Sequence, residues 1–334
     1  SALDMSLLQP QAMVICPTRE LARQNEVVIS QLGKFLQVQT CLVCPGPDRV
    51  PKNPKCHVLV GTPGKFTDLV KKYILDVSAI KVFVLDEADV MLDQDNMMGP
   101  QVTQVRKWLP ADLQVLFFSA TYPDTVREFA EKIVPKAFNI KVRKTDLTVS
   151  SVAQMYVQCE SEEDKFRKLS NLYGAMNVGQ SVIFVNQRKT AFGLAQGMHD
   201  AGHTVSLICG TVRDGKEQMD PELRDRVMHE FRSGVTRVLI ATDVLARGID
   251  VPQVTLVVNY ELPLHYGDRS AVNMETYVHR IGRTGRFGLC GIAINLVLPS
   301  QRHLVEDVKS FFACEIPEAD GDFEMIEERL KMLR

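Results

Sequence analysis

The sequence predicts an α/β protein built from two parallel-sheet domains in tandem. Short apolar runs rich in β-branched residues recur along the chain, and stretches with apolar residues at helical spacing lie between most of them. Strands of a parallel sheet are covered by helices on both faces, so they read as continuous apolar runs rather than alternating ones. A length of 334 residues with 45% hydrophobic content gives each of two domains enough apolar material for its own core.

The predicted strands fall into two groups along the chain. The first group is residues 12–16, 57–60, 81–85 and 115–118, and the second is residues 181–185, 204–208, 237–241, 254–259 and 292–298. Helical spacing marks residues 20–36, 125–133 and 221–231. Between the groups, residues 141–151 are polar, and a new apolar run begins at Val152. The polar stretch predicts a linker, which places the domains at residues 1–145 and 146–334.

The charge balance excludes a partner held by bulk electrostatics. Lys and Arg number 39 and Asp and Glu 41, a formal charge of −2, so a nucleic-acid site must be built locally from a few cations and backbone amides. The uncharged and mostly apolar stretch at residues 287–301 has 15 residues and is shorter than the ~18–20 that a membrane helix needs. We therefore expect no membrane insertion.

The cysteine content is typical of a reducing compartment. There are eight cysteines, without the density of a small secreted scaffold. Cys41 and Cys44 form a C-x-x-C, and Cys56-His57 completes a four-ligand zinc set by residue type. Their apolar neighbours predict a strand, in which positions three apart face opposite ways. We expect no zinc there.

An acidic cluster follows the apolar run at residues 81–85. Asp86, Glu87 and Asp89 place three carboxylates within four residues at the carboxyl end of a predicted strand. Ligands of parallel sheets gather at such ends, where an Asp can hold Mg²⁺ and an adjacent Glu can polarise a water for attack on a phosphate. Taken alone, the cluster also suits the acidic first turn of an ordinary helix.

A basic cluster lies near the end of the chain. On a helix, His279, Arg283 and Arg286 are at i, i+4 and i+7 and share one face, while Gly282 and Gly285 leave room for close backbone approach. Two guanidinium groups on one face suit phosphate oxygens. The alternative is a solvated cationic helix face.

Three further predicted strands end in polar residues. Pro17-Thr18-Arg19 and Thr62-Pro63-Gly64 place hydroxyls, amides and a cation where they can hold a phosphodiester backbone without reading bases. Ser119 and Thr121 follow residues 115–118, where their hydroxyls can reach the acidic cluster. Each of these segments also has an ordinary interpretation as a helix cap.

Taken together, these segments resemble the motifs of the DEAD-box family of ATP-dependent RNA helicases. Seven motifs occur in the family's order between residues 17 and 286. They are Pro17-Thr18-Arg19-Glu20-Leu21-Ala22, Thr62-Pro63-Gly64-Lys65 (with Lys for the usual Arg), Asp86-Glu87-Ala88-Asp89, Ser119-Ala120-Thr121, residues 182–187, residues 241–250 and residues 279–286.

The resemblance implies two RecA-like domains, ATP and Mg²⁺ as cofactors, and RNA bound by its backbone between the domains. It implies that Arg283 and Arg286 act as arginine fingers, that Asp86 holds Mg²⁺ through water, and that Ser119 and Thr121 connect the acidic cluster to His279. Gly248 and Asp250 would lie at the nucleotide, with Asp250 facing the ribose. The RNA track of the first domain would continue on the second through Thr242, Asp243 and Arg247.

The family's phosphate-binding loop, G-x-x-x-x-G-K-[ST], and its adenine-reading glutamine motif are not found in the 334 residues. Residues 210–216 have the glycine and lysine spacing, but Glu217 stands where a hydroxyl is needed, and Pro221 delays the helix that should follow. Since the family places both motifs before residue 17, we expect a first domain that lacks its N-terminal P-loop segment, a fragment of a longer helicase, and no ATP hydrolysis by these residues alone. The alternative is a non-catalytic RNA-binding or adaptor protein, a pseudo-helicase without a P-loop.

Within the family, the chain most resembles the mRNA-export helicases of the nuclear pore, the Dbp5 type. The stretches that carry this resemblance are residues 80–91, residues 171–175 and the long spacer at residues 264–274, with an acidic amphipathic tail at residues 322–333. Residues 44–49 and 214–223 depart from it, the latter as a short insertion. The resemblance implies nucleoporin and mRNA-export partners, a monomer, and a location in cytoplasm and nucleus at the cytoplasmic face of the pore.

Overall fold

The computed structural model describes residues 3–46, 49–92, 98–119, 121–122, 124–135, 137–140, 151–175, 179–209, 220–243, 251–265, 268–285, 289–319 and 326. The chain divides into two compact units, Ser1–Ile140 and Lys141–Arg334. The predicted linker, apart from Ser151, lies outside the described residues. None of the helices in the described ranges is long and apolar enough to cross a membrane.

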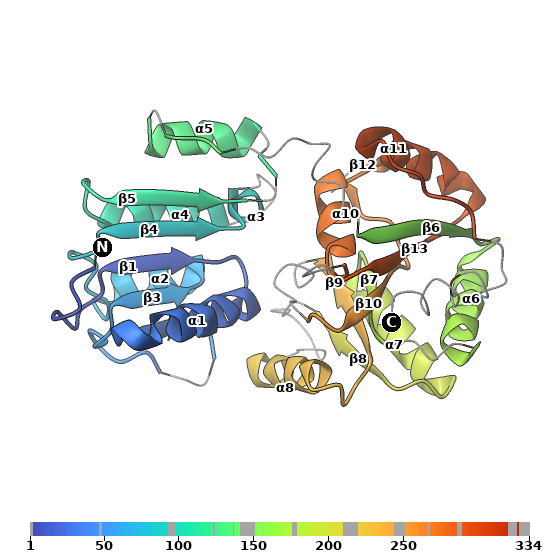
Figure 1. Ribbon diagram of the computed structural model, residues 1–334, viewed down its shortest axis with the longest axis horizontal. Coiled ribbons are helices and arrows are strands. Elements are labelled where there is room, and N and C mark those ends of the chain that lie inside the picture. Colours follow the sequence, from blue (N-terminus) through green and yellow to red (C-terminus); the bar gives the residue numbers. More distant parts are fainter. Residues whose placement is uncertain are drawn as a thin grey trace. The chain divides into compact units, whose positions relative to one another are not determined.

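The first unit alternates strands and helices as the sequence predicts. In chain order its elements are β1 (Ala12–Ile15), α1 (Arg19–Gly33), the 3-10 helix η1 (Lys34–Leu36), β2 (Thr40–Val43), β3 (Val58–Gly61), α2 (Pro63–Lys71), β4 (Val82–Asp86), α3 (Ala88–Leu92), α4 (Met98–Trp108), β5 (Gln114–Phe118) and α5 (Asp124–Ile133). The strands form one sheet in the order β2-β3-β1-β4-β5. Every pair in it is parallel, and Figure 1 shows the arrowheads of β1, β3, β4 and β5 at one edge.

The second unit is also built on a parallel sheet. Its elements are β6 (Val152–Gln158), α6 (Glu162–Ala175), β7 (Gln180–Val185), α7 (Arg188–Asp200), β8 (Val205–Ile208), α8 (Pro221–Arg232), β9 (Val238–Thr242), β10 (Val254–Asn259), β11 (Leu264–His265), β12 (Asp268–Val272), α10 (Met274–Ile281), β13 (Gly291–Val297), η3 (Pro299–Gln301) and α11 (Arg302–Phe312). Six strands pair in the order β6-β13-β10-β7-β9-β8, and β11 and β12 form a separate antiparallel pair. The prediction of parallel α/β architecture in both halves is confirmed.

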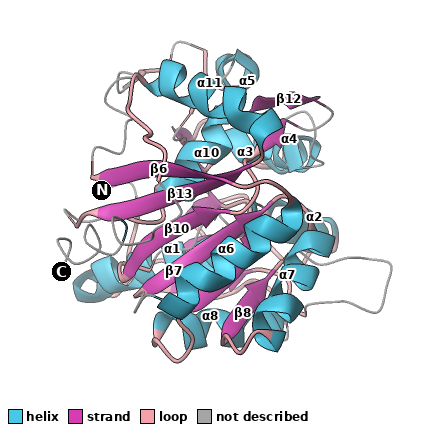
Figure 2. Ribbon diagram, turned by 90° about the vertical axis from the view of Figure 1, so that its right-hand side faces the viewer, coloured by secondary structure: helices cyan, strands magenta, loops and turns pink. Residues whose placement is uncertain are grey.

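Helices cover both faces of each sheet, which is why the strands read as continuous apolar runs. In the first unit, α1 packs on one face through Leu21 and Ala22, and α2 and α4 pack on the other. In the second unit, α6 and α7 share one face, as Figure 2 shows, and α8, α10 and α11 cover the other. This layering leaves the carboxyl ends of the strands as the edge at which polar residues can gather.

Candidate functional site

The carboxyl edge of the first sheet brings four separate sequence motifs together. In register, Ile15 of β1 pairs with Gly61 of β3 on one side and with Leu85 of β4 on the other, and Asp86 pairs with Phe118 of β5. Thr62, Thr18, Asp86 and Ser119, which follow these strands, are therefore neighbours in that order along one edge. The chain crosses from one side of β1 to the other here, which is where ligands of open α/β sheets bind.

Two helices start side by side at this edge. Thr18 caps α1, and its hydroxyl accepts a hydrogen bond of 3.2 Å from the Leu21 amide. Thr62 precedes α2 in an extended conformation, Pro63 occupies the first helical turn, and the Thr62 hydroxyl makes no capping hydrogen bond. Gly64, in the first turn of α2, is exposed. Amides and hydroxyls at two adjacent helix starts can bind successive phosphates of a backbone.

Arg19 is placed differently from the other residues of its motif. Its side chain is 6% exposed, and its guanidinium donates to the Pro45 carbonyl, just after β2. Gly46 lies against the same guanidinium at φ +151°, where a Cβ would stand 1.8 Å from Arg19 Nη1. Arg19 therefore fastens the segment after β2 to the start of α1.

Asp86 is oriented by two donors. The Asn25 side chain, on α1, donates to Asp86 Oδ2 at 2.7 Å, and the Glu87 amide donates to Oδ1 at 3.1 Å. Asn25 also donates to Cys16 Sγ at 3.3 Å, and burial raises the pKa of the Cys16 thiol far above its usual value. A fixed carboxylate at a strand end, with lone pairs left over, fits a water-mediated Mg²⁺ ligand. Asn25 is a site residue that the motif analysis missed.

Glu87 has a backbone conformation that few non-glycine residues adopt. Its φ is +55°, in the left-handed region, which costs about 1 kcal/mol or more for a residue with a Cβ. Its carbonyl accepts from the Val90 amide at 3.1 Å and so starts α3. Glu87 therefore forms the sharp turn between the end of β4 at Asp86 and the start of α3 at Ala88.

Asp89 joins the acidic cluster to the hydroxyls that follow β5. The Thr121 hydroxyl donates to Asp89 Oδ2 at 2.7 Å, and the Asp89 amide donates to Ser119 Oγ at 3.2 Å. Asp89 is 4% exposed. The sequence placed these hydroxyls within reach of the acidic cluster, and the structure brings them into contact with it. Their connection to His279, which belongs to the second unit, stays a prediction.

In the second unit, one buried arginine organises the carboxyl ends of β7, β9 and β10. Arg280, on α10, is 0% exposed and donates to both oxygens of Asp243, at 2.5 and 2.8 Å. It also donates to Asn186 Oδ1 at 2.6 Å, to the Glu261 carbonyl at 2.6 Å and to Asn259 Oδ1 at 3.3 Å. Three separate strands are thereby held to one helix.

The sequence analysis missed Arg280 because it considered only the basic residues expected on the same helical face as His279. A signal was present, since Arg280 lies three residues after Tyr277 and one before Ile281, both buried apolar positions of α10. An arginine in such a stripe needs a buried acceptor. The structure supplies Asp243, which the motif analysis had placed on an RNA track. Thr242, the last residue of β9, is itself buried.

The prediction that His279 and Arg283 share one face of a helix is wrong, and Arg286 lies outside the described residues. Helix α10 ends at Ile281, and Gly282 caps it at φ −69° and ψ 4°. Arg283 lies in the following turn, where its Nε donates to the His279 carbonyl at 2.8 Å. Gly285 has φ +69°, and a Cβ there would meet Ser151 Oγ at 2.7 Å. Gly282 therefore ends the helix, whereas Gly285 allows the close approach that the sequence predicts, here by Ser151 and Val152.

Four predicted residues lie outside the described part of the chain, namely Arg247, Gly248, Asp250 and Arg286. The glycine-lysine segment at residues 210–216 and the acidic tail at residues 322–333 also lie outside it, except for Ile326.

The cysteine spacing behaves as predicted. Cys41 packs with the core that includes Leu59, whereas Cys44 packs with the core that includes Val60, on the other face of the sheet. Both ring nitrogens of His57 are engaged, Nδ1 by the Gln39 amide at 3.0 Å and Nε2 at 3.3 Å from the Met5 carbonyl. These residues do not converge on a metal site.

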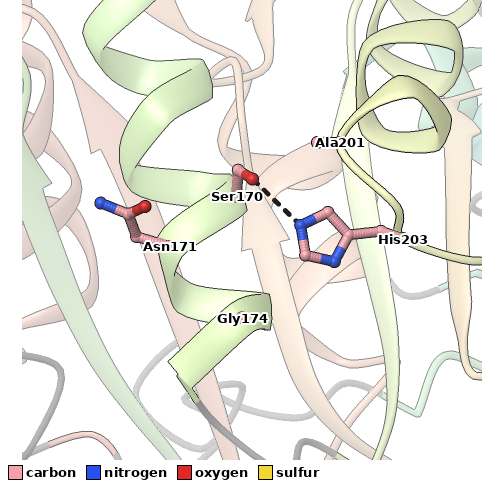
Figure 3. A pocket seen from close by; sticks show the side chains of 5 residues that line it. All are labelled: Ser170, Asn171, Gly174, Ala201 and His203. Carbon is pink, nitrogen blue, oxygen red and sulfur yellow. Dashed lines mark hydrogen bonds between the residues drawn. The ribbon is translucent and has the colours of Figure 1, made fainter.

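A surface hollow of about 460 Å³ lies in the second unit, away from the predicted residues (Figure 3). It is lined by Ser170, Asn171, Gly174, Ala201 and His203, and Ser170 Oγ lies 3.0 Å from His203 Nε2. The lining offers no carboxylate to orient the imidazole and no cation to hold a phosphate. Chemistry is therefore better assigned to the strand ends.

Family models match both halves of the chain. Residues 2–129 match the model described as DEAD/DEAH box helicase, and residues 164–288 match that described as helicase conserved C-terminal domain. The chain belongs to the DEAD-box helicase family. The DEAD-box protein of Mycosarcoma maydis named ATP-dependent RNA helicase DBP5 is 42% identical over 99% of this chain and 71% of its own length. DBP5 of Saccharomyces cerevisiae strain YJM789 is 41% identical over 95% of this chain, which spans 62% of that relative's length.

Solved DEAD-box structures show the same fold. S. cerevisiae Dbp5 bound to RNA and ADP BeF3 gives a TM-score of 0.92 at 39% identity, covering 99% of this chain and 83% of that one. S. cerevisiae Dbp5 bound to Nup159, Gle1, IP6 and ADP gives 0.65 at 37% identity, covering 99% and 84%. The predicted resemblance to Dbp5-type DEAD-box helicases is confirmed, and with it the fold class of two RecA-like domains.

Proposed function

We propose that this chain is the core of an ATP-dependent RNA helicase of the Dbp5 type, which couples ATP hydrolysis to RNA strand separation or to remodelling of ribonucleoprotein in mRNA export. The observation that carries the proposal is the hydrogen-bonded junction of Asp89 with Ser119 and Thr121 beside Asp86 and Glu87. An ordinary acidic helix start would need neither these hydroxyls nor a strained Glu87. Residues 1–145 would form the ATP-binding domain and residues 146–334 the C-terminal helicase domain.

In this assignment each residue of the acidic edge has one task. Asp86, oriented by Asn25, holds Mg²⁺ through water, and Glu87 orients the attacking water and accepts its proton. The hydrogen bonds of Asp89 with Ser119 and Thr121 couple the acidic cluster to the segment after β5. Mg²⁺, when bound, supplies charge neutralisation at the phosphates. His279, Arg283, Arg286, Gly248 and Asp250 supply the contacts of the second domain to the nucleotide.

RNA binding rests on amides and hydroxyls more than on net charge. Pro17, Thr18, Thr62, Pro63 and Gly64 surround two adjacent helix starts, which suit backbone phosphates. On the second domain the track continues through Thr242 and Arg247. Arg19 and Asp243, whose charged groups are engaged by Pro45 and Arg280, shape the track by position. Such contacts position RNA without reading its sequence.

The phosphate-binding loop sets a limit on what residues 1–334 do alone. Since they contain no G-x-x-x-x-G-K-[ST] in a suitable context, we propose that they bind RNA but do not hydrolyse ATP by themselves. The same observation favours the second candidate function, a non-catalytic RNA-binding or adaptor protein. The intact set of Asp86, Glu87 and Arg283 favours the helicase, because an adaptor needs none of them.

The partners follow from the Dbp5 relatives. Yeast Dbp5 has been solved with Gle1 and IP6, and with Nup159, Gle1, IP6 and ADP. We propose that this protein, as a monomer, likewise binds a nucleoporin and an export factor of the Gle1 kind. We propose the matching location in cytoplasm and nucleus, at the cytoplasmic face of the nuclear pore.

RNA binding is tested on residues 1–334 by fluorescence anisotropy with a labelled single-stranded RNA. Gly64→Asp puts a carboxylate at the start of α2, where the nearest foreign atom to a new Cβ is Gln101 Oε1 at 3.3 Å. We expect RNA affinity to fall at least tenfold. Gly193→Asp makes the same charge change at an exposed glycine of α7 with open space around it, and should leave affinity within twofold. Equal effects of the two variants would contradict the track.

Catalysis is tested by RNA-stimulated ATP hydrolysis. Residues 1–334 alone should show none, whereas the same residues joined to a P-loop segment should show turnover that Glu87→Gln abolishes. Turnover by residues 1–334 that disappears with Glu87→Gln would refute the assigned need for the P-loop. RNA binding without turnover in the joined protein would favour the adaptor.

A further inference from the structure

Two cysteines outside the helicase motifs lie together at one end of the first sheet. Cys41 is the second residue of β2, and Cys56 comes two residues before β3, the strand that pairs with β2. The segment containing Cys56 is held against β2, because the amides of both His57 and Val58 donate to the Gln39 carbonyl, at 2.8 and 3.2 Å.

Both thiols are on the same face of the sheet. Cys41 pairs in register with Leu59, and Cys41, Cys56 and Leu59 belong to one apolar cluster. The Cys56 thiol donates a hydrogen bond to the Cys41 sulfur. All eight cysteines fall within the described residues, and none of them forms a disulfide in the structure.

We propose that Cys41 and Cys56 are a redox-active dithiol that hydrogen peroxide converts into a reversible intramolecular disulfide. The modification is independent of the helicase function proposed above. It assigns Cys41 as the thiol that meets the oxidant and Cys56 as the thiol that resolves it.

The environments of the two thiols fit their assigned roles, with Cys41 meeting the oxidant and Cys56 resolving the sulfenic acid. Cys41 is partly exposed, whereas Cys56 is 1% exposed. The hydrogen bond from Cys56 holds the pKa of Cys41 below its usual value, and the same contact together with burial raises the pKa of Cys56. A thiolate that is accessible and next to a second thiol is the arrangement found in redox-sensing cysteines.

The chemistry balances in two steps. The Cys41 thiolate attacks one oxygen of hydrogen peroxide, which forms a sulfenic acid and releases hydroxide that takes the thiol proton and leaves as water. The Cys56 sulfur then attacks the Cys41 sulfur, forming the S–S bond and expelling the sulfenic oxygen, which takes the Cys56 proton and leaves as the second water. Two thiols lose two electrons, and the peroxide gains them.

The remaining cysteines are less suited to this reaction. Cys16 and Cys44 are buried, and burial raises the pKa of Cys44 to about 12. Cys159 is buried, and its pKa is raised to about 11. Cys290 is exposed, and it serves as the reference for an accessible thiol outside this pair.

The test uses the reduced 334-residue protein treated with a small excess of hydrogen peroxide, then blocked with N-ethylmaleimide, digested and mapped by mass spectrometry. We expect one cross-linked peptide pair containing Cys41 and Cys56, two mass units lighter than the two free peptides, and its loss after dithiothreitol. Cys16, Cys44 and Cys159 should carry no oxidation.

Two serine variants separate the roles of the thiols. Cys56→Ser should leave Cys41 as a sulfenic acid that dimedone traps, whereas Cys41→Ser should leave Cys56 unoxidised at the same peroxide dose. Cys290→Ser is the control and should leave the cross-link unchanged. The proposal is overturned if Cys41 and Cys56 remain free when Cys290 is oxidised, if Cys41 cross-links to another cysteine, or if Cys56→Ser gives no trapped sulfenic acid.

Discussion

Removing the Arg280 side chain should destabilise the second unit more than any other single change at the motif residues described there. Arg280→Met keeps an apolar stem of similar length but removes five hydrogen bonds, two of them to Asp243. Asn186, Asn259 and the Glu261 carbonyl would each lose a donor. Breaking a buried ion pair from one side costs about 3–5 kcal/mol.

We expect Arg280→Met to lower the free energy of unfolding by about 3–4 kcal/mol, within the lower part of that range. Arg280 is fully buried, but the Asp243 side chain is 35% exposed, so water can reach the carboxylate once the guanidinium is gone. Three of the five lost hydrogen bonds are to uncharged acceptors, each with a net contribution of about 1 kcal/mol. For a unit of 194 residues, from Lys141 to Arg334, this corresponds to a fall in Tm of roughly 6–16 °C.

The single tryptophan makes the assay specific to one unit. Trp108 is on α4 of the first unit, so its fluorescence follows unfolding of that unit, whereas far-UV circular dichroism follows both. Arg280→Met should lower a transition seen by circular dichroism and leave the Trp108 transition within 2 °C. Arg226→Met, on the exposed side of α8, is the matched control and should change stability by less than about 0.5 kcal/mol.

A double-mutant cycle with Asp243→Asn isolates the ion pair. We expect a coupling energy of about 2 kcal/mol between Arg280 and Asp243, because the pair is bidentate and largely shielded. A loss below 1 kcal/mol for Arg280→Met, or additive effects of the two changes, would refute the reasoning that this arginine holds the strand ends together.

Three further predictions concern single side chains. Because the φ of Glu87 is +55°, Glu87→Gly should be at least as stable as the wild type in urea unfolding, whereas Glu87→Val should lose about 2 kcal/mol. Equal stabilities of the Gly and Val variants would contradict the backbone strain. Thr121→Val removes the donor to Asp89 and should cost about 1.5–3 kcal/mol by the same measurement, with no loss if that hydrogen bond is unimportant. Hydrogen bonding to the Glu160 amide, with Arg167 and Lys168 nearby, lowers the pKa of Asp164 to about 2, so the stability it contributes is present above pH 3.8 and lost as the pH falls to about 2. The stability difference between wild type and Asp164→Asn should therefore vanish over that interval of acid titration, and a constant difference would count against it.

Strand positions were predictable from the sequence, whereas the fine geometry of the site was not. A buried parallel strand must be apolar over its whole length, and the run at residues 254–259 coincides with β10. The short edge strand β2 is only partly buried and gave a weaker pattern. The end of α10 was predictable, since glycine often follows the last turn of a helix and Gly282 does so here, but the prediction followed the spacing of the basic residues instead.

The contacts of Asn25 and Arg280 could not be read from local sequence. Asn25 reaches Asp86 across 61 positions because β1 and β4 are neighbours, and Arg280 reaches Asp243 across 37 because α10 packs over β9 and β10. Neither separation follows from any helical or strand period. Such pairs depend on the order of strands in the sheet, which apolar patterning does not specify.

The two units position their motif residues differently, the first by strand register and the second by a buried ion pair. In the first unit the strand register places Thr18, Thr62 and Asp86 side by side, at the starts of α1 and α2 and at the end of β4. In the second unit a full positive charge, Arg280, is buried and neutralised by Asp243. The proposed RNA track therefore relies on amides at helix starts rather than on a surplus of cations, in agreement with the net charge of −2. RNA affinity should accordingly depend less steeply on salt than it does for a protein that binds through many lysines, and a slope typical of six or more phosphate contacts would contradict this assignment.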